Sequence, residues 1–548
     1  MAVAGLSWAV IAAALGVLGW FIGVQVAGDS ALWLSDLMAL PFTGAVIIMA
    51  LPGRFERFIR WIAAVFSFGA LVLSVVVAVT FQHGEGATVF QFTESSAWIP
   101  SFGAGWTLAV DGIGVAMELL TGIIIFAGVL ASWRVETRPR EFFALLLILV
   151  TGVFGVFASQ DLLLFFLFYE LAVLPMYLLI GIWGTGPKEY SAMKLTLYLL
   201  TGSALMLVGF LAIYFGTATY GAPGSHELTF GLDAIRRMSF PVSVQRFYFP
   251  FLFIGFGILA GYWPLHTWSP DGHASAPTAV SMLHAGVLMK LGAFGIIRVA
   301  VEVFPDGAQF WLPWFVLLTL VNITYGAFAA MAQTDLKYVI AYSSVSHMGI
   351  VVLGIATLGD AGLNGAVLQM FSHGIMTGLF FALVGFTYEK THTRIIAEYG
   401  GLGRRMPVLA TFFTIGGLAS LGLPGLSGFV AEFMVFYGAW QMNPVICSIA
   451  VVGLVVTAAY VLRVLQKCFW GPITNPHFEE LQDARVNEWI CLAILAFVLI
   501  AVGLMPGWLV SIINSGVAPV LDRVHSAGTA VAGTAAAAAA RVAAGGAG

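Results

Sequence analysis

Long apolar segments recur along nearly the whole chain, and they constrain its fold more than any motif does. The hydrocarbon core of a bilayer takes about 20 apolar helical residues, and we count about fifteen segments of this length. They lie at roughly 4–27, 31–52, 58–81, 108–132, 140–158, 161–183, 190–218, 247–268, 276–301, 309–332, 336–358, 361–388, 407–438, 445–472 and 486–512. Only 9% of the residues are charged. The sequence therefore predicts an all-α polytopic membrane helix bundle.

Basic residues in the loops predict how this bundle is oriented. They follow the even-numbered segments: Arg54, Arg57, Arg60, Arg134, Arg138, Arg140, Lys188, Lys337, Lys390, Arg394, Arg404 and Arg405. The positive-inside rule places these loops in the cytoplasm, which puts the N-terminus inside and the C-terminus outside. The loop at 219–246 is the exception, and long loops obey the rule less strictly.

The two ends of the chain differ from the central domain at 31–512. Residues 1–30 form an additional N-terminal hydrophobic segment without a basic n-region, so we expect a retained anchor rather than a cleaved signal peptide. Residues 513–548 form a tail rich in alanine and glycine, to which we assign no function.

The stretch Trp263–Arg298 places Lys290 in the apolar run AGVLMKLGAFGII. An ammonium in hydrocarbon costs several kcal/mol unless it faces a partner or water, and a buried lysine can switch between its charged and neutral forms. Pro264, Pro270 and Pro277 interrupt the preceding helix, and such breaks are tolerated where they line protein or a wet cavity. A broken helix beside a buried base predicts an ion path.

Two acids also lie at membrane depth. Glu170 is flanked by apolar residues in LLLFFLFYELAVLPMYLL, and Glu432 follows a break at Gly422, Pro424 and Gly425 in LASLGLPGLSGFVAEFMVFYG. Acids inside a membrane are functional candidates, although a neutral glutamic acid hydrogen-bonded within the bundle is the alternative. The segment at 407–438 is expected to be a discontinuous spanning helix.

Four histidines add titratable groups to the same spans. His347 and His373 lie in mid-span, and His266 and His284 lie in the Trp263–Arg298 stretch. Histidine titrates near neutral pH and passes protons in either direction, so we favour a wet polar axis over four separate packing hydrogen bonds. Lys194 is either part of this axis or an interfacial lysine that reaches the membrane surface.

Other residues exclude several functions. Asp111, and Asp335 with Lys337, lie near helix ends and are expected to be caps or orientation charges. The three cysteines lack metal-ligand spacing, and no Walker-type phosphate loop occurs. The net charge of −4 is spread over loops and gives no reason to expect nucleic acid. We therefore expect no metal and no cofactor in this chain.

Four runs in order carry a resemblance to a known family: LFYELAVLPMYLLIGIWG, PLHTWSPDGHASAPTAVSMLHAGVLMKLGAFG, AQTDLKYVIAYSSVSHMGIVVLG and LASLGLPGLSGFVAEFMVFYG. They resemble the antiporter-like M subunits of bacterial NADH:quinone oxidoreductase, equivalent to chain 4 of the mitochondrial enzyme. The resemblance implies fourteen spanning helices with two inverted five-helix repeats, each holding a discontinuous helix. It also implies a proton-translocating subunit of the cytoplasmic membrane, whose partners are other membrane-arm subunits, including antiporter-like ones. FMN, iron–sulfur clusters and quinone would belong to partner subunits.

The resemblance also implies roles for single residues. Glu170 would be the acid of a first half-channel, Lys290 the central lysine, and Glu432 the terminal acid of a second half-channel, with His347 and His373 on the hydrated axis between them. Lys194, His266, His284 and Lys337 are auxiliary candidates. One position departs from the family, because Leu259 stands where a lysine is usual.

That departure leaves alternatives open. Glu170 could pair with another cation such as Lys194, His266 or His284 could substitute for the missing lysine, its charge could be modulated in a different way, or this copy could pump less well. Two rival functions also stay open: a subunit of a sodium/proton antiporter or membrane-bound hydrogenase, and a structural scaffold of the membrane arm.

Overall fold

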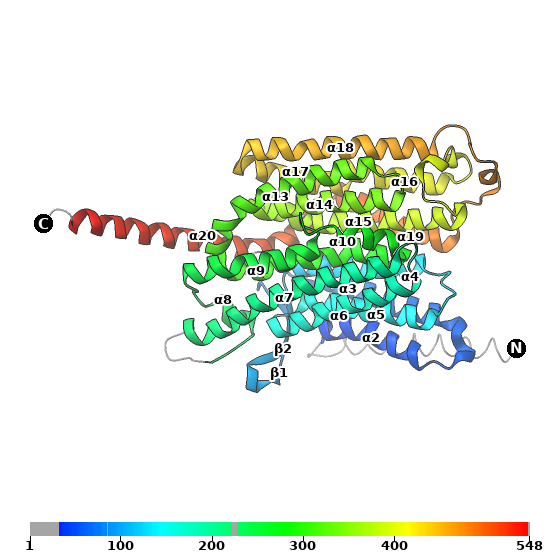
Figure 1. The fold of residues 1–548 in the computed structure, drawn as a ribbon. Coiled ribbons are helices and arrows are strands. Elements are labelled where there is room, and N and C mark those ends of the chain that lie inside the picture. Colours follow the sequence, from blue (N-terminus) through cyan, green and yellow to red (C-terminus); the bar gives the residue numbers. More distant parts are fainter. Residues whose placement is uncertain (1–31, 85, 222–226, 546–548) are drawn as a thin grey trace.

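The spanning helices run side by side along the bundle (Figure 1). This computed structural model describes residues 32–84, 86–221 and 227–545. The first half contains α2 (Trp33–Ala50), η1 (Gly53–Phe58), α3 (Ile59–Thr80), β1 (Gln91–Ile99), η2 (Pro100–Phe102), β2 (Ala104–Val110), α4 (Gly112–Ala131), α5 (Pro139–Ala158), α6 (Leu162–Trp183), α7 (Lys188–Tyr220), α8 (Leu232–Arg236), α9 (Val242–Ala260) and α10 (Trp268–Ser275). Helix thus dominates the chain, as its apolar segments predict.

The second half is also helical. It contains α11 (Thr278–Leu283), η3 (His284–Leu288), α12 (Met289–Gly295), η4 (Ile296–Val301), α13 (Pro305–Ala332), α14 (Leu336–Ala356), α15 (Asp360–Thr391), η5 (Ile396–Glu398), η6 (Leu402–Arg404), α16 (Pro407–Ser420), α17 (Ser427–Met442), α18 (Pro444–Phe469), η7 (Pro476–Glu480), α19 (Val486–Leu504) and α20 (Pro506–Gly545). Over the described ranges, 13 segments are long and apolar enough to cross a membrane. The helical membrane bundle is confirmed. The segment at 4–27 lies outside the described residues, and the inverted repeats stay a prediction.

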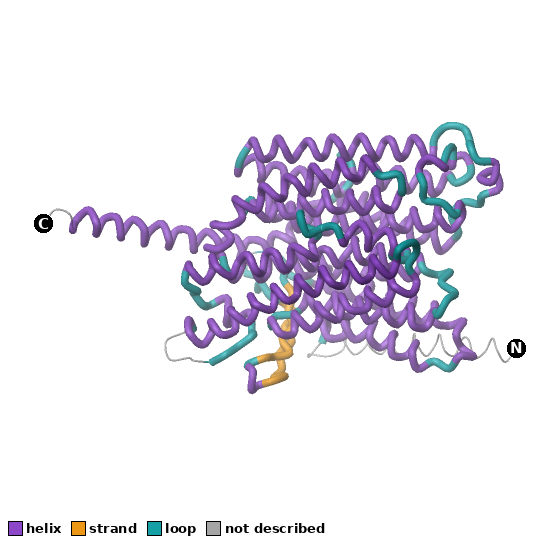
Figure 2. Tube along the Cα trace, in the orientation of Figure 1, coloured by secondary structure: helices purple, strands orange, loops and turns teal. Residues whose placement is uncertain are grey.

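The connecting loops gather at two opposite ends of the bundle (Figure 2). Contacts between distant loops define one of them: Arg60 donates to the Val135 carbonyl at 3.1 Å, and Arg394 to that of Ala274 at 2.8 Å. We call this end, which carries the loops rich in arginine and lysine, the basic end. The other end, where Arg236 donates to Gln160 at 3.0 Å, is called the hairpin end.

The hairpin end takes its name from β1 and β2, which pair antiparallel. The sequence analysis did not predict these strands. Glu94 of β1 accepts hydrogen bonds from the amides of Leu34, at 2.8 Å, and Ser35, at 3.2 Å, so it caps the start of α2 from another element. A carboxylate is well placed at a helix N-terminus, where free amides and the helix dipole favour negative charge. Glu94 thus joins the hairpin to α2, while the Gly105 amide of β2 joins it to Asp161 at 3.0 Å.

Two spanning segments are broken at membrane depth, as expected. The chain leaves α9 at Gly261, whose φ of 74° favours glycine, and resumes helix in α10. Pro270 lies inside α10 rather than in a break, so the interruptions fall at 261–267 and 276–277. The second break, at 421–426, separates α16 from α17. The expected discontinuous helix at 407–438 is thus two half-helices.

The last helix crosses the hairpin end. The expected span at 486–512 ends at Leu504, and α20 begins at Pro506 and continues past residue 512 into the alanine-rich tail. Gln309 of α13 donates to the Val524 carbonyl at 2.6 Å, and Asn364 of α15 to Asn514 at 3.0 Å. This part of α20 ties the ends of several helices together, and its later part extends beyond the bundle (Figure 1).

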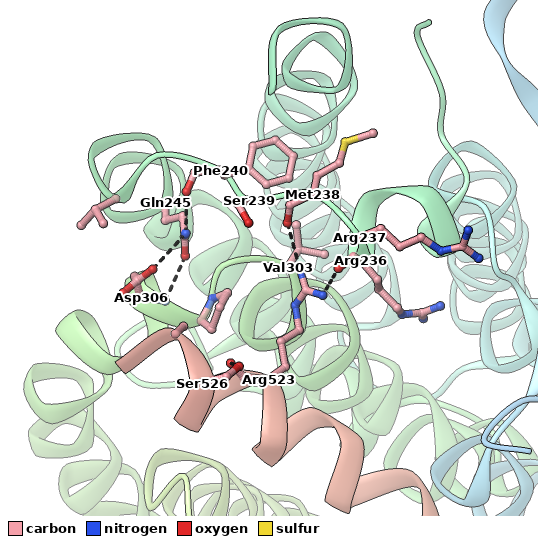
Figure 3. A pocket seen from close by; sticks show the side chains of 13 residues that line it. Arg236, Arg237, Met238, Ser239, Phe240, Gln245, Val303, Asp306, Arg523 and Ser526 are labelled. Carbon is pink, nitrogen blue, oxygen red and sulfur yellow. Dashed lines mark hydrogen bonds between the residues drawn. The ribbon is translucent and has the colours of Figure 1, made fainter. Parts of the chain in front are cut away.

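A cavity of about 440 Å³ opens between α20 and the loop before α9. Arg523 donates to the backbone carbonyls of Arg236 and Met238, and Gln245 donates to Asp306 at 3.1 Å (Figure 3). The arginine thus serves to dock α20 onto this loop. The cavity lies at the hairpin end, apart from the buried groups described next.

Candidate functional site

Lys290 is fully buried on α12. Its Nζ lies 2.9 Å from Nδ1 of His373 on α15 and also donates to the carbonyl of Ala285. The segments before and after α12, η3 and η4, are π-helical, and such wide turns occur often at functional sites because they redirect side chains and free backbone carbonyls. No carboxylate contacts this ammonium among the described residues. Lys290 therefore has a histidine as its neighbour instead of an ion-pair partner.

A second pair of buried titratable groups, His347 and Glu432, lies next to His373. The rings of His373 and His347 are 5.3 Å apart, and His347 Nδ1 lies 3.1 Å from Oε1 of Glu432 on α17. Gln369 donates to the same Glu432 oxygen at 3.3 Å, and Ser420 lies 3.2 Å from the other nitrogen of His347. Lys290, His373, His347 and Glu432, which we call the central chain, thus form a continuous series of buried titratable groups.

The break between α16 and α17 positions the last member of this chain. Gly422 has a φ of 71°, and a Cβ added there would come within 2.9 Å of Glu432 Oε2. That oxygen is buried without a hydrogen-bond partner in the structure. Glycine at 422 therefore serves both the left-handed turn and the space beside the carboxylate.

Three more histidines lie in the interrupted segment that precedes Lys290. The rings of His273 and His284 are 4.2 Å apart, and His266 packs on Tyr325 with ring centroids 5.2 Å apart. None of the four ring nitrogens of His273 and His284 has a protein hydrogen-bond partner in the described structure. Buried polar groups are normally satisfied, so these nitrogens are suited to contact water.

Lys194 has a partner that the sequence analysis did not anticipate. Its Nζ lies 2.8 Å from Asp271 on α10, and Tyr338 donates to the other oxygen of that carboxylate at 3.3 Å. Lys194 is therefore ion-paired with the broken helix. This pairing argues against the alternative that Lys194 only reaches the membrane surface.

Glu170 lies apart from both groups. It interacts with Ser203 of α7, which is nine residues from Lys194, or about 13 Å along a helix. A lysine side chain is too short to span that separation, so the Glu170–Lys194 pair considered above is not formed. Glu170 is partly exposed on the face of α6 that also presents Leu167 and Leu174.

Lys337 is buried near the basic end. Its backbone amide is capped by Asp335 at 2.7 Å, while its Nζ donates to the Ala276 carbonyl in the break after α10 at 2.6 Å. The capping role expected for Asp335 is confirmed, and so is that of Asp111, which accepts from the Gly114 amide at 2.9 Å. A cavity of about 200 Å³ lies beside Lys337. It is also lined by Arg134, Thr278, Glu389 and Arg394.

Several polar residues of the site escaped the sequence analysis. Gln369 precedes His373 by four residues, a spacing that places both on one helix face and could have revealed it. His273 and Asp271 stand in the SPDGH run at 269–273, between the chosen histidines His266 and His284. In the described part of the chain, no three His, Cys, Asp or Glu side chains gather as metal ligands would.

These features define the class of protein. It is a multi-pass membrane protein in which a buried chain of titratable side chains runs beside two discontinuous helices, an arrangement suited to moving ions. Residues 159–457 match the family described as NADH:quinone oxidoreductase/Mrp antiporter, transmembrane. The chain belongs to this family, which confirms the resemblance inferred from its motifs.

Relatives and solved structures agree with this assignment. NAD(P)H-quinone oxidoreductase chain 4 3 of Picosynechococcus is 39% identical over 509 residues, covering 86% of this chain and 91% of the relative. Chain 4-2 of Synechocystis is 39% identical over 470 residues, covering 84% and 82%. A chain of respiratory complex I from Thermus thermophilus matches with a TM-score of 0.81 and 27% identity, covering 90% of this chain and 99% of that one. A chain of the Mrp complex from Dietzia shares the fold, with a TM-score of 0.78, 19% identity, and 89% and 97% coverage.

Proposed function

We propose that this chain is a proton-translocating membrane-arm subunit of an NADH:quinone oxidoreductase. The proposal rests on the central chain. Its four side chains follow one another in space at contact or near-contact distance, in the order Lys290, His373, His347 and Glu432. Buried groups that titrate and touch one another can pass protons without a bound substrate. The family relationship supplies the reaction that would drive this transfer.

We assign Lys290 as the group that takes up and releases the translocated proton. As an ammonium it donates to His373 and to a backbone carbonyl, and as an amine it needs no counter-charge in the membrane interior. A nearby negative charge favours the ammonium and its withdrawal favours the amine, so a change of charge at a distance suffices to load or release the proton. His373 and His347 accept a proton on one ring nitrogen and release one from the other.

Entry from the basic end is proposed through the cavity beside Lys337. Lys337 donates to the Ala276 carbonyl, and Ser281 links the carbonyls of Ala276 and His273, at 3.3 and 2.9 Å. The ring of His273 lies 4.2 Å from that of His284, which precedes Lys290 by six residues. The unpartnered ring nitrogens along this route would be bridged by water.

The first half-channel is proposed to work without the usual lysine. Leu259 is fully buried and leaves no cation at that position. The Lys194–Asp271 pair supplies the charge at the broken helix instead, at 2.8 Å. Glu170 retains its assignment as the acid of this half. Because it is partly exposed at mid-membrane, we assign its face to contact with a neighbouring membrane-arm subunit.

The redox chemistry is assigned to partner subunits. FMN, iron–sulfur clusters and quinone would be held there, and this chain would contribute to the translocase only by carrying protons. The relatives are named as chains of quinone oxidoreductases, and the solved matches are chains of larger complexes.

One triple variant separates this proposal from a scaffold role. Glu170→Gln, Lys290→Met and Glu432→Gln are combined in the assembled complex in sealed vesicles, and NADH:quinone turnover is recorded beside proton uptake. The proposal predicts that the triple variant assembles normally and loses coupled proton uptake. If the chain is only a structural scaffold, coupled proton uptake is retained. Arg405→Met, at an exposed loop position, is the control. Replacing sodium by choline distinguishes a sodium/proton antiporter, because proton transport by this chain does not require sodium.

A further inference from the structure

The cavity of about 440 Å³ at the hairpin end is used neither by the central chain nor by the proposed entry route. It lies between α20, the loop that leads into α9 and the start of α13. Cavities that hold small molecules measure about 300–1,000 Å³, so this one is large enough for a ligand. Four charged side chains line it: Arg236, Arg237, Asp306 and Arg523. The partners of these charges decide what the cavity can bind.

Two of the three arginines already have acidic partners. Arg236 pairs with Glu302 at 2.7 Å, and Arg237 pairs with Asp233 at 2.7 Å. Arg523 differs, because its guanidinium donates to backbone carbonyls of the loop and forms no ion pair among the described residues. Arg523 therefore brings a positive charge to the cavity without a carboxylate in contact with it.

Asp306 is the complementary case in the same cavity. One oxygen of its carboxylate accepts from the neutral amide of Gln245 at 3.1 Å, and its backbone amide donates to Gln245 at 2.9 Å. It forms no ion pair with any cation in the part of the chain that the structure describes. Figure 3 shows Asp306 and Arg523 on different sides of the cavity. One cation and one carboxylate thus line the cavity without being paired with each other.

Aromatic side chains place this cavity near the membrane surface. Both α9 and α13 begin beside it and lead from it into the bundle. Phe247 of α9 and Trp314 of α13 are each 63% exposed, and Trp311 donates to the Arg246 carbonyl at 2.7 Å. Tryptophans of membrane proteins gather at the level of the lipid headgroups. An apolar surface that suits acyl chains therefore runs from the cavity into the membrane.

Arg246 adds a second cation beside the cavity. It follows the lining residue Val242 by one turn, so both lie on one face of α9. Its exposed side chain packs over the Phe310 ring at 4.5 Å and forms no ion pair in the described structure. Arg236, Arg237 and Arg246 are also the basic residues of the loop at 219–246, which departs from the positive-inside rule. A ligand at this end gives these arginines a role other than orientation.

We propose that the cavity binds the headgroup of a zwitterionic phospholipid, phosphatidylethanolamine. The phosphate lies at Arg523 and Arg246, because guanidinium groups hold phosphate oxygens through charge-assisted hydrogen bonds. The primary ammonium lies at Asp306, and the acyl chains lie along α9 and α13. Phosphatidylglycerol offers no ammonium, and the quaternary ammonium of phosphatidylcholine donates no N–H hydrogen bond. The site is separate from the central chain and does not depend on proton transfer there.

Hydrogen–deuterium exchange of the assembled complex in nanodiscs tests this assignment. The bilayer is phosphatidylcholine alone, or phosphatidylcholine with the same fraction of phosphatidylethanolamine or phosphatidylglycerol. The readout is the exchange of a peptide covering 237–245, the loop and first turn of α9 beside the cavity. A ligand that binds only the closed loop slows exchange about twofold at half occupancy. We expect slowing of at least this size with phosphatidylethanolamine, and none with the other two bilayers.

Variants assign the effect to the cavity. Asp306→Asn is expected to abolish the slowing, because the amide carries no charge to hold the ammonium. Asp522→Asn, at an exposed acid next to Arg523, is the matched control and is expected to keep it. Arg523→Gln is expected to abolish the slowing as well. If Arg523→Gln does not assemble, Arg246→Gln takes its place, since that exposed side chain contacts only a ring.

Each outcome decides for or against the proposal. Slowing by phosphatidylethanolamine that is lost in Asp306→Asn and in the arginine variant supports it. Equal slowing by phosphatidylglycerol, or by inorganic phosphate added to phosphatidylcholine nanodiscs, would show a simple anion site and overturn it. No slowing with any lipid, or slowing that persists in Asp306→Asn, would also overturn it. None of these readouts depends on NADH:quinone turnover or proton uptake.

Discussion

The ammonium of Lys290 lies 2.9 Å from Nδ1 of His373, with both side chains buried and no carboxylate in contact with the lysine among the described residues. A lysine beside a neutral base holds its proton less firmly than one in an ion pair, because only the ion pair adds a charge attraction that favours the ammonium. This relationship makes the pair a place where a proton can be exchanged rather than stored.

His373→Leu tests whether the histidine connects Lys290 to His347. Because leucine fills the space without a proton acceptor, we expect proton uptake to fall by about tenfold or more, equivalent to about 1.4 kcal/mol of added barrier. The measurement is proton uptake in sealed vesicles relative to complex content. His83→Leu, at an exposed position of the hairpin end, should leave uptake unchanged. Wild-type uptake in His373→Leu would mean that protons bypass this residue.

Gly422→Ala tests the turn beside Glu432. The φ of 71° disfavours a side chain, and the added methyl would come within 2.9 Å of the carboxylate. We expect a loss of stability of about 1–2 kcal/mol from the backbone alone, measured as a lower thermal unfolding temperature of the complex. Gly53→Ala is the control, since a Cβ there meets nothing within 4 Å in the described structure. Equal thermal unfolding temperatures for Gly422→Ala and Gly53→Ala would contradict the role assigned to Gly422.

Arg298→Met tests the buried ion network at the hairpin end. Arg298 pairs with Asp111 at 2.5 Å and with Glu302 at 3.1 Å, and Glu302 also pairs with Arg236. Removing Arg298 leaves the buried Asp111 carboxylate uncompensated, which costs about 3–5 kcal/mol, although Glu302 keeps its pair with Arg236. We expect poor assembly or a large drop in thermal stability.

Arg237→Met provides the matched control for that prediction. Its pair with Asp233 is 79% and 71% exposed, and exposed pairs contribute only about 0–1 kcal/mol. Similar losses in Arg298→Met and Arg237→Met would show that the buried network does not stabilise the hairpin end.

The Lys194–Asp271 pair is tested by a double-mutant cycle with Lys194→Met and Asp271→Asn. Both side chains are mostly buried, and we expect a coupling energy of about 1 kcal/mol in unfolding free energy. Tyr338→Phe removes the second donor to Asp271 and should weaken the coupling. Strictly additive effects would show that the pair contributes nothing to the broken helix.

The sequence predicted the spanning helices well because apolar length is a local property. The segments at 140–158 and 161–183 differ from α5 and α6 by a single residue. The hairpin was missed because β1 exposes polar residues and its Glu94 caps a distant helix, while β2 is apolar and leads directly into α4. Capping across elements leaves no local pattern in the sequence.

Single residues of the site were identifiable, whereas their pairing was not. Lys290, His347, His373 and Glu432 stood out as titratable groups in apolar segments, yet nothing local indicated that α12, α14, α15 and α17 bring them together. The partner of Lys194 was missed for the same reason, since Asp271 is 77 residues away. Contacts of such separation are decided by helix packing, which periodicity does not encode.

The most direct test of this account is Lys290→Met in the assembled complex in sealed vesicles, with NADH:quinone turnover and proton uptake recorded together. Leu259→Lys, which restores the usual lysine, serves as companion variant. The account predicts normal assembly of Lys290→Met with collapse of both turnover and proton uptake, because an obligatory proton site is coupled to the redox reaction. Wild-type turnover and uptake in Lys290→Met would contradict it.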